Sequence, residues 1–222
     1  MSRYRIGVFA SGGGSNLQAL MDRIRSGELP VDLAFVLSNN SKSGALAKAK
    51  AFGTEAYHVS GFTEGGEDKA EARMAGIVEA ARIDLLVLAG YMKLVPRSVH
   101  ALLPNRILNI HPALLPAFGG AGFYGSKVHE AVVERGCQFT GVTIHMVNQA
   151  YDEGQIILQR IVPVARGSSP ETVASEVLRQ EHACYWQVVR AFAVGEIKPT
   201  ASADPGRAVD LGRFLDRFAA GD

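Results

Sequence analysis

The chain has 222 residues, of which 47% are hydrophobic and 20% charged, as expected for a globular protein with one main domain. Its 23 Lys and Arg balance 22 Asp and Glu, so it lacks the basic excess that is typical of nucleic-acid-binding proteins. The two cysteines, Cys137 and Cys184, form no C-x-x-C pair, and no apolar run reaches the roughly 18 residues of a membrane span. We therefore expect a soluble, reduced, cytoplasmic protein that binds neither nucleic acid nor membrane.

Short apolar runs alternate with segments of helical periodicity along the first 110 residues. This alternation predicts a parallel sheet with right-handed crossovers. We expect strands at 6–10, 31–37, 56–59, 84–89 and 106–110, and helices that begin at Ser15 as N-cap, span 43–52 and 68–81, and start at Pro96. Ligands of such sheets bind beyond the carboxyl ends of the strands, which selects the segments 11–16, 90–95 and 111–124.

The second half has a different pattern, with fewer crossovers and a long amphipathic segment. The expected elements are a helix at 127–135, two strands at 139–147 and 155–164 that form an antiparallel hairpin, and a long helix from Pro170 to about Val194. The fold class that we predict is α/β, a Rossmann-like, mostly parallel sheet with flanking helices and a C-terminal antiparallel hairpin plus long helix. Residues 200–222 are expected to form a surface tail.

The segment Ser11-Gly-Gly-Gly-Ser-Asn links the first strand to the first helix. A glycine-rich turn at the start of a helix exposes backbone N–H groups that suit a phosphate. The Walker pattern fails because no Lys-Ser/Thr follows, and the dinucleotide fingerprint fails at Leu17, where a third glycine should stand. A single phosphate is therefore favoured over NAD, and a tight turn without ligand remains an alternative.

The segment Asn109-Ile-His-Pro ends the fifth predicted strand. Asn109 and His111 are two residues apart, so their side chains lie on one face of the strand, and Pro112 keeps the chain extended there. An amide donor beside an imidazole can stabilise a developing oxyanion. The alternative is that His111 only forms a local hydrogen bond at the end of the strand.

Tyr151-Asp152-Glu153-Gly154 lies between the two predicted hairpin strands. An acidic pair before glycine is usually a solvated turn, and it gains a function only if the loop folds back over His111. His145 lies in a β-rich run and faces either the site or the core. No histidine pair has the i, i+4 spacing of a helical zinc site, so we expect no metal.

Five motifs of the chain together resemble the phosphoribosylglycinamide formyltransferases, a family of folate-dependent enzymes. The motifs run in order over about residues 5–195: Gly14-Ser15-Asn16, Leu88-Ala-Gly-Tyr-Met, Asn109-Ile-His-Pro-Ala-Leu-Leu-Pro, Asp152-x-Gly154 and Gln180-Glu-His. The resemblance implies transfer of a formyl group from the co-substrate 10-formyltetrahydrofolate to glycinamide ribonucleotide, in purine synthesis. It further implies small-molecule substrates, no metal, and monomers or homodimers.

The resemblance also assigns roles to residues of this chain. Asn109, His111 and Asp152 would be catalytic. The substrate phosphate site would comprise Gly12, Gly13, Gly14, Ser15, Asn16 and Glu181. The folate site would comprise Met92, Lys93, Leu94, Val95, Asn109, Val147, Ala150 and Asp152. We expect a single formyltransferase domain over 1–199, with a nucleotide-phosphate half at about 1–108 and a folate and catalytic half at about 109–199. The glycine-rich loop 119–125 departs from the family pattern; we expect it to form a lid, with Phe118 and Gly120 lining the site.

Three other functions are considered. Formyltetrahydrofolate hydrolase shares the Asn-x-His core but resembles this chain with an added N-terminal domain; we expect no such domain here, because the first predicted strand begins by residue 5. Methionyl-tRNA formyltransferase carries an extra C-terminal domain and a basic face, whereas the net charge here is +1. A catalytically inactive nucleotide-binding module is disfavoured because Asn109, His111 and Asp152 are all present.

Overall fold

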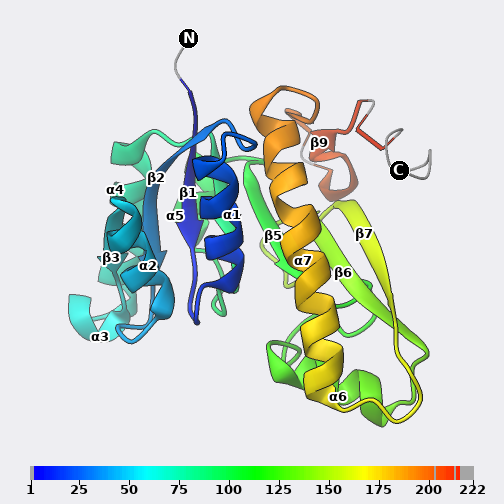
Figure 1. Cartoon of the computed structure of the whole chain (residues 1–222). Helices are drawn as coiled ribbons and strands as arrows, with labels where there is room; N and C mark the ends of the chain where they lie inside the picture. The colour runs from blue at the N-terminus through cyan, green and yellow to red at the C-terminus, as the bar shows by residue number, and fades with distance from the viewer. Residues whose placement is uncertain (1–2, 203, 213, 216–222) are drawn as a thin grey trace. The chain divides into compact units, whose positions relative to one another are not determined.

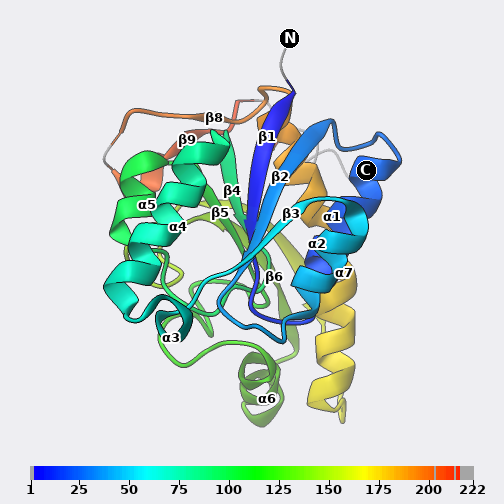
Figure 2. The ribbon, with the colours of Figure 1, turned by 90° about the vertical axis from the view of Figure 1, so that its left-hand side faces the viewer.

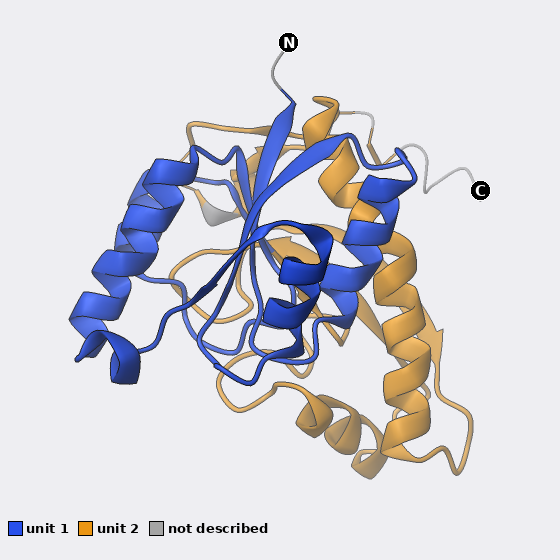
Figure 3. Cartoon of the chain, turned by 60° about the vertical axis from the view of Figure 1, so that its left-hand side comes forward, with its two compact units in different colours: residues 1–108 blue, residues 109–222 orange. Residues whose placement is uncertain are grey.

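The computed structural model describes residues 3–202, 204–212 and 214–215. The chain forms two compact units, residues 1–108 and 109–222 (Figure 3). The prediction of a surface tail falls partly on residues 203, 213 and 216–222, which lie outside the described residues. None of the described helices is long and apolar enough to cross a membrane.

The first unit alternates strands and helices, as predicted. Its elements are β1 (Tyr4–Phe9), α1 (Ser15–Arg25), β2 (Val31–Ser38), α2 (Gly44–Phe52), β3 (Glu55–His58), α3 (Gly61–Glu64), α4 (Glu67–Ala81), β4 (Leu85–Leu88) and α5 (Arg97–Leu102). The strands pair in parallel in the order β3-β2-β1-β4. Helices α1 and α2 cover one face of these strands, and α4 and α5 cover the other (Figure 2). Residues 6–9 of β1 and all of β4 are consequently buried on both faces, as the short apolar runs there predict.

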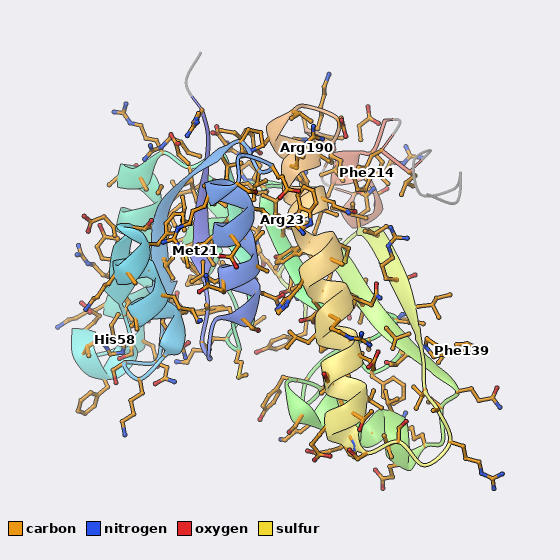
Figure 4. All side chains as sticks on the ribbon, viewed as in Figure 1. Met21, Arg23, His58, Phe139, Arg190 and Phe214 are labelled. Atoms are coloured by element: carbon orange, nitrogen blue, oxygen red, sulfur yellow. The ribbon has the colours of Figure 1, made fainter. Side chains whose placement is uncertain are left out.

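The second unit contains the end of β5 and the antiparallel hairpin. Its elements are β5 (Ile107–His111), which begins in the first unit, α6 (Ser126–Glu134), β6 (Phe139–Met146), β7 (Ile156–Pro163), α7 (Pro170–Ala193), β8 (Lys198–Pro199), a 3-10 turn (Pro205–Arg207) and β9 (Val209–Asp210). Strands β6 and β7 pair antiparallel, and α7 packs on both of them and on α6 (Figure 1). In the C-terminal segment, β8 and β9 form a small second sheet. The side chain of Phe214, which Figure 4 labels, is buried, with 2% exposure.

The hydrogen-bonded order of the strands is β3-β2-β1-β4-β5-β6-β7. The predicted α/β fold, with its mostly parallel sheet, C-terminal hairpin and long helix, is confirmed. Two local expectations are wrong or incomplete. The N-cap of α1 is Gly14 rather than Ser15, because the residue there has a φ of 72° and an added Cβ would lie 2.9 Å from Ala45 Cα. The short elements α3, β8 and β9 have too few residues to show a periodic pattern.

Candidate active site

In the first unit, the loop after β1 presents backbone N–H groups at the start of α1. Its carbonyl oxygens are held by the β2–α2 loop: Asn40 Nδ2 donates to Ser11 O at 3.2 Å, and Ser43 Oγ donates to Gly12 O at 2.7 Å. Within the described part of the chain, the N–H groups of Gly13 and Gly14 donate to no protein acceptor. A strand-to-helix loop with tethered carbonyls and free N–H groups is suited to an anion.

Close packing between this loop and α2 requires glycine on both sides. A Cβ added at Gly44 would lie 2.9 Å from Gly13 O, so even alanine would displace the loop. The predicted phosphate residues 12–16 therefore lie together in a closely packed loop and the first residues of α1. Glu181, which the sequence assigns to the same site, lies on α7 in the second unit and is buried.

The predicted folate segment Met92-Lys-Leu-Val follows β4 in the first unit. Met92 N donates to Ser11 Oγ at 3.0 Å, and Ser11 Oγ donates to Asn39 Oδ1 at 2.6 Å. The segment is thus tied to the glycine loop by one hydroxyl group. Val95 is buried, whereas the side chains of Met92 and Leu94 are about half exposed and Lys93 forms an ion pair with Glu67 at 3.2 Å.

In the second unit, the structure brings the predicted catalytic side chains together. Asn109 and His111 project from the same face of β5, because they are two residues apart on a strand. His111 Nδ1 lies 3.6 Å from Asp152 Oδ2. Asn109 is linked to Asp152 by the side chain of His145. The Nε2 atom of His145 lies 3.1 Å from Asn109 Nδ2 and 3.6 Å from Asp152 Oδ1.

Asp152 reaches His111 because the loop between β6 and β7 folds back on itself. A Cβ added at Gly154 would lie 1.7 Å from Met146 O, so only glycine permits this approach. Asp152 has a φ of 58°, which turns the chain sharply before Gly154. At the other end of the loop, Ala150 N donates to Asn148 Oδ1 at 2.9 Å. The loop is therefore a folded structure and not the solvated turn that the sequence left as an alternative. Val147 and Ala150, both predicted to bind folate, are partly exposed.

The glycine-rich segment after Pro116 lies against the same side chains. His111 Nε2 donates to Phe118 O at 2.8 Å, and Gly120 N donates to Asp152 Oδ2 at 3.0 Å. The guanidinium of Arg135 lies 5.0 Å from the centroid of the Phe118 ring, a cation–π contact that holds the segment. The Nε2 atom of His111 carries the proton that Phe118 O accepts, so in neutral His111 the Nδ1 atom is an acceptor. Nδ1 can donate to Asp152 only when His111 is protonated.

Burial lowers the pKa of His111, and the Asp152 carboxylate and the Phe118 carbonyl offset only part of that effect. Burial alone would raise the pKa of the Asp152 carboxyl, but the neighbouring imidazoles of His145 and His111 and the Gly120 N–H lower it overall. The favoured resting state is thus an ionised Asp152 beside a neutral His111. Such a pair can accept a proton on the imidazole and stabilise the resulting charge.

Two features of the site lie outside the residues predicted from the sequence. His145 is 1% exposed and contacts two of the three predicted catalytic residues. Thr143 Oγ1 donates to Ala113 O at 2.7 Å and accepts from Leu115 N at 3.0 Å, which fastens the chain after His111 to β6. In the sequence, the alternation of Thr143 and His145 on β6 indicates that the two side chains share a face of the strand. It does not tell whether that face borders the site.

No group of three or more His, Cys, Asp or Glu side chains that could hold a metal ion occurs among the described residues.

Comparison with known proteins decides the family. The model of the formyl transferase family matches residues 4–189. The chain belongs to the formyl transferase family. Its resemblance to the phosphoribosylglycinamide formyltransferases, predicted from the sequence, is confirmed, and so is its class as a transferase. Members of this family use formyl-tetrahydrofolate as co-substrate.

Three relatives illustrate how far the similarity to this family extends. The chain is 39% identical over 197 residues to the chloroplastic phosphoribosylglycinamide formyltransferase of Arabidopsis thaliana, which covers 88% of this chain and 68% of the relative. It is 33% identical to the Haemophilus influenzae phosphoribosylglycinamide formyltransferase, and the aligned region covers 87% of this chain and 89% of that relative. The crystal structure of glycinamide ribonucleotide transformylase 1 from Symbiobacterium toebii matches with a TM-score of 0.83 at 38% identity, and the match covers 90% of this chain and 92% of that one.

Proposed function

We propose that the protein transfers the formyl group of 10-formyltetrahydrofolate to the amine of glycinamide ribonucleotide, giving formylglycinamide ribonucleotide and tetrahydrofolate in purine biosynthesis. The observation that carries the proposal is the 3.6 Å approach of Asp152 to His111, next to Asn109, in a member of the formyl transferase family. An amide, an imidazole and a carboxylate supply the donors and the proton acceptor that acyl transfer to an amine needs.

The co-substrate supplies an activated formyl carbon. The C–N bond to the substrate amine forms, the C–N bond to the folate nitrogen breaks, the amine loses one proton and the folate nitrogen gains one. Asn109 Nδ2 donates a hydrogen bond to the formyl oxygen, where negative charge develops. His111 takes part as the proton carrier, and the Asp152 carboxylate stabilises its protonated form across 3.6 Å.

The other predicted residues bind rather than react. The loop that leads into α1, with residues 12–16, holds the phosphate of the ribonucleotide through its backbone N–H groups, among them those of Gly13 and Gly14. Glu181 is an anion, so the ribose hydroxyls, which are donors, are more suitable partners for it than the phosphate. Residues Met92–Val95, Val147 and Ala150 line the site of the folate ring.

A transfer assay separates this function from its alternatives. The purified protein is incubated with 10-formyltetrahydrofolate and, in parallel, with glycinamide ribonucleotide, with methionyl-tRNA or with water alone. Formylation of the ribonucleotide, with little formate released in water alone, supports the proposal. Formate release at the same rate with and without an acceptor would indicate a hydrolase instead. Failure of all acceptors, in a protein that still binds the folate, would indicate a binding module.

A cytoplasmic location, a reaction without metal and a homodimer remain predictions. The first is checked by fractionation of the producing cell, the second by elemental analysis and dialysis against a chelator, and the third by sedimentation equilibrium.

A further inference from the structure

We propose that His145 is a positioning residue for the transfer: its Nε2 atom fixes the amide orientation of Asn109, and its ring limits where the Asp152 carboxylate can lie. This inference rests on the proposed function. His145 lies on β6, and its side chain is 2% exposed. The β6–β7 pairing is irregular between Ile144 and His145. Such an irregularity re-aims a side chain relative to a regular strand.

The tautomer of His145 follows from its two ring contacts. Nδ1 lies 2.9 Å from Met146 O, and a carbonyl oxygen can only accept, so Nδ1 carries a proton. In neutral His145 the Nε2 atom is therefore an acceptor. The 3.1 Å contact with Asn109 Nδ2 has hydrogen-bond length, whereas the 3.6 Å contact with Asp152 Oδ1 does not. Asn109 is thus the donor to Nε2.

This contact decides what Asn109 presents to a substrate. An asparagine amide can turn by 180° and exchange its oxygen and nitrogen at little steric cost. With the Nε2 acceptor in place, the NH₂ group is held on the His145 side, and one of its two N–H bonds remains for a formyl oxygen. Without that acceptor, the carbonyl oxygen of Asn109 could face the developing negative charge and repel it.

The same imidazole confines Asp152. Gly120 N donates to Oδ2 at 3.0 Å, and the His145 ring lies beside Oδ1. The hydrogen bond from Gly120 on one side and steric contact with the His145 ring on the other leave the carboxylate with Oδ2 toward His111 Nδ1. An ordinary core histidine would satisfy its ring with groups that only maintain the fold, whereas here the contacts of Nε2 are two side chains of the proposed catalytic trio, from β5 and from the 147–154 loop.

Two amide substitutions separate the contacts of the two ring nitrogens. In His145→Gln the side-chain amide reaches about the position of Nε2, so the contact with Asn109 can be kept. In His145→Asn the amide reaches only the position of Nδ1, so the contact with Met146 O can be kept while that with Asn109 is lost. His100→Asn, on α5 in the first unit, is the control for exchanging a half-buried histidine.

We expect His145→Gln to retain kcat within about five-fold and His145→Asn to lose about 10²-fold, because a misplacement of about 1 Å in a catalytic group costs that much. The KM for glycinamide ribonucleotide should change little in both variants, and thermal unfolding should stay similar between them. Equal losses of kcat in both variants, in parallel with equal losses of stability, would overturn the proposal and leave His145 a structural residue.

A measurement without substrate distinguishes this proposal from the proposed function. The ¹⁵N shifts of the His145 ring should report a proton on Nδ1 and none on Nε2 at neutral pH. The titration of His111 should be altered in His145→Asn but not in His145→Gln. A proton on Nε2 of His145 in the wild type, or equal His111 titrations in both variants, would overturn the positioning role even if formyl transfer is observed. The predicted shifts in a protein that transfers no formyl group would instead uphold the positioning role and refute the function.

Discussion

Replacing Asp152 by Asn removes one charge beside His111 with almost no change in shape. The substituted amide keeps an oxygen that can accept from Gly120 N, so the loop should stay folded. In the wild type the carboxylate lies 3.6 Å from His111 Nδ1, and its side chain is 13% exposed. At an effective dielectric constant of about 20 to 40, the attraction to a protonated His111 is about 2–5 kcal/mol.

If the proton is on His111 in the transition state but not in the ground state, this energy converts to a loss of about 30- to 5,000-fold in kcat. The assay is steady-state formyl transfer to glycinamide ribonucleotide, with KM determined for both substrates. The limb of the pH profile that belongs to His111 should also move to lower pH, because the charge that raises its pKa is gone. Glu153→Gln, an exposed carboxylate on the same loop, is the matched control. Asp152→Asn with near-normal kcat and an unchanged circular dichroism spectrum would refute the role of this ion pair.

Three further perturbations test other parts of the site. His111→Ala should lower kcat by at least about 10²-fold with the fold intact, and a folded variant with ordinary turnover would exclude the imidazole from the chemistry. Gly119→Ala places a Cβ 2.5 Å from a leucine side-chain carbon and 3.3 Å from Asp152 Cβ, so it should displace the loop and reduce activity more than Gly76→Ala on α4, which needs no positive φ and meets no atom within 4 Å. Equal kcat/KM in these two variants would show that the loop contact is irrelevant. Burial lowers the pKa of His100 below 6.5 in the folded protein. The buried neutral imidazole therefore contributes stability above pH 6.5, and this contribution is lost as the pH falls through the folded pKa of His100. The free energy of unfolding from urea titrations should therefore decrease less between about pH 7 and pH 5 in His100→Gln than in the wild type, and parallel pH curves would contradict this.

The elements of the fold were predictable because their signals are local. The apolar run at β4 indicates a strand covered on both faces, and Gly53 marks the end of α2, where its φ is 85°. The start of α1 was not predictable in the same way. Ser15 is a good N-cap by residue type, but the approach of Ala45, which is distant in sequence, requires glycine at position 14 and shifts the cap to it.

The site shows the same division between local and long-range information. Asn109 and His111 share a face because a strand alternates, so the sequence alone pairs them. Asp152 is 41 positions further along, and its approach depends on the fit of Gly154 against a backbone carbonyl, which no periodicity encodes. The sequence does not tell whether His145 faces the core or the site, since alternation on β6 leaves both choices open.

A crystal structure with a folate analogue and glycinamide ribonucleotide bound tests the central claim most directly. The account predicts that the reacting carbon lies within hydrogen-bond reach of Asn109 and His111, with Asp152 no further than one water molecule away. A reacting carbon more than about 10 Å from these three side chains, or a ribonucleotide phosphate bound away from residues 12–16, would contradict it.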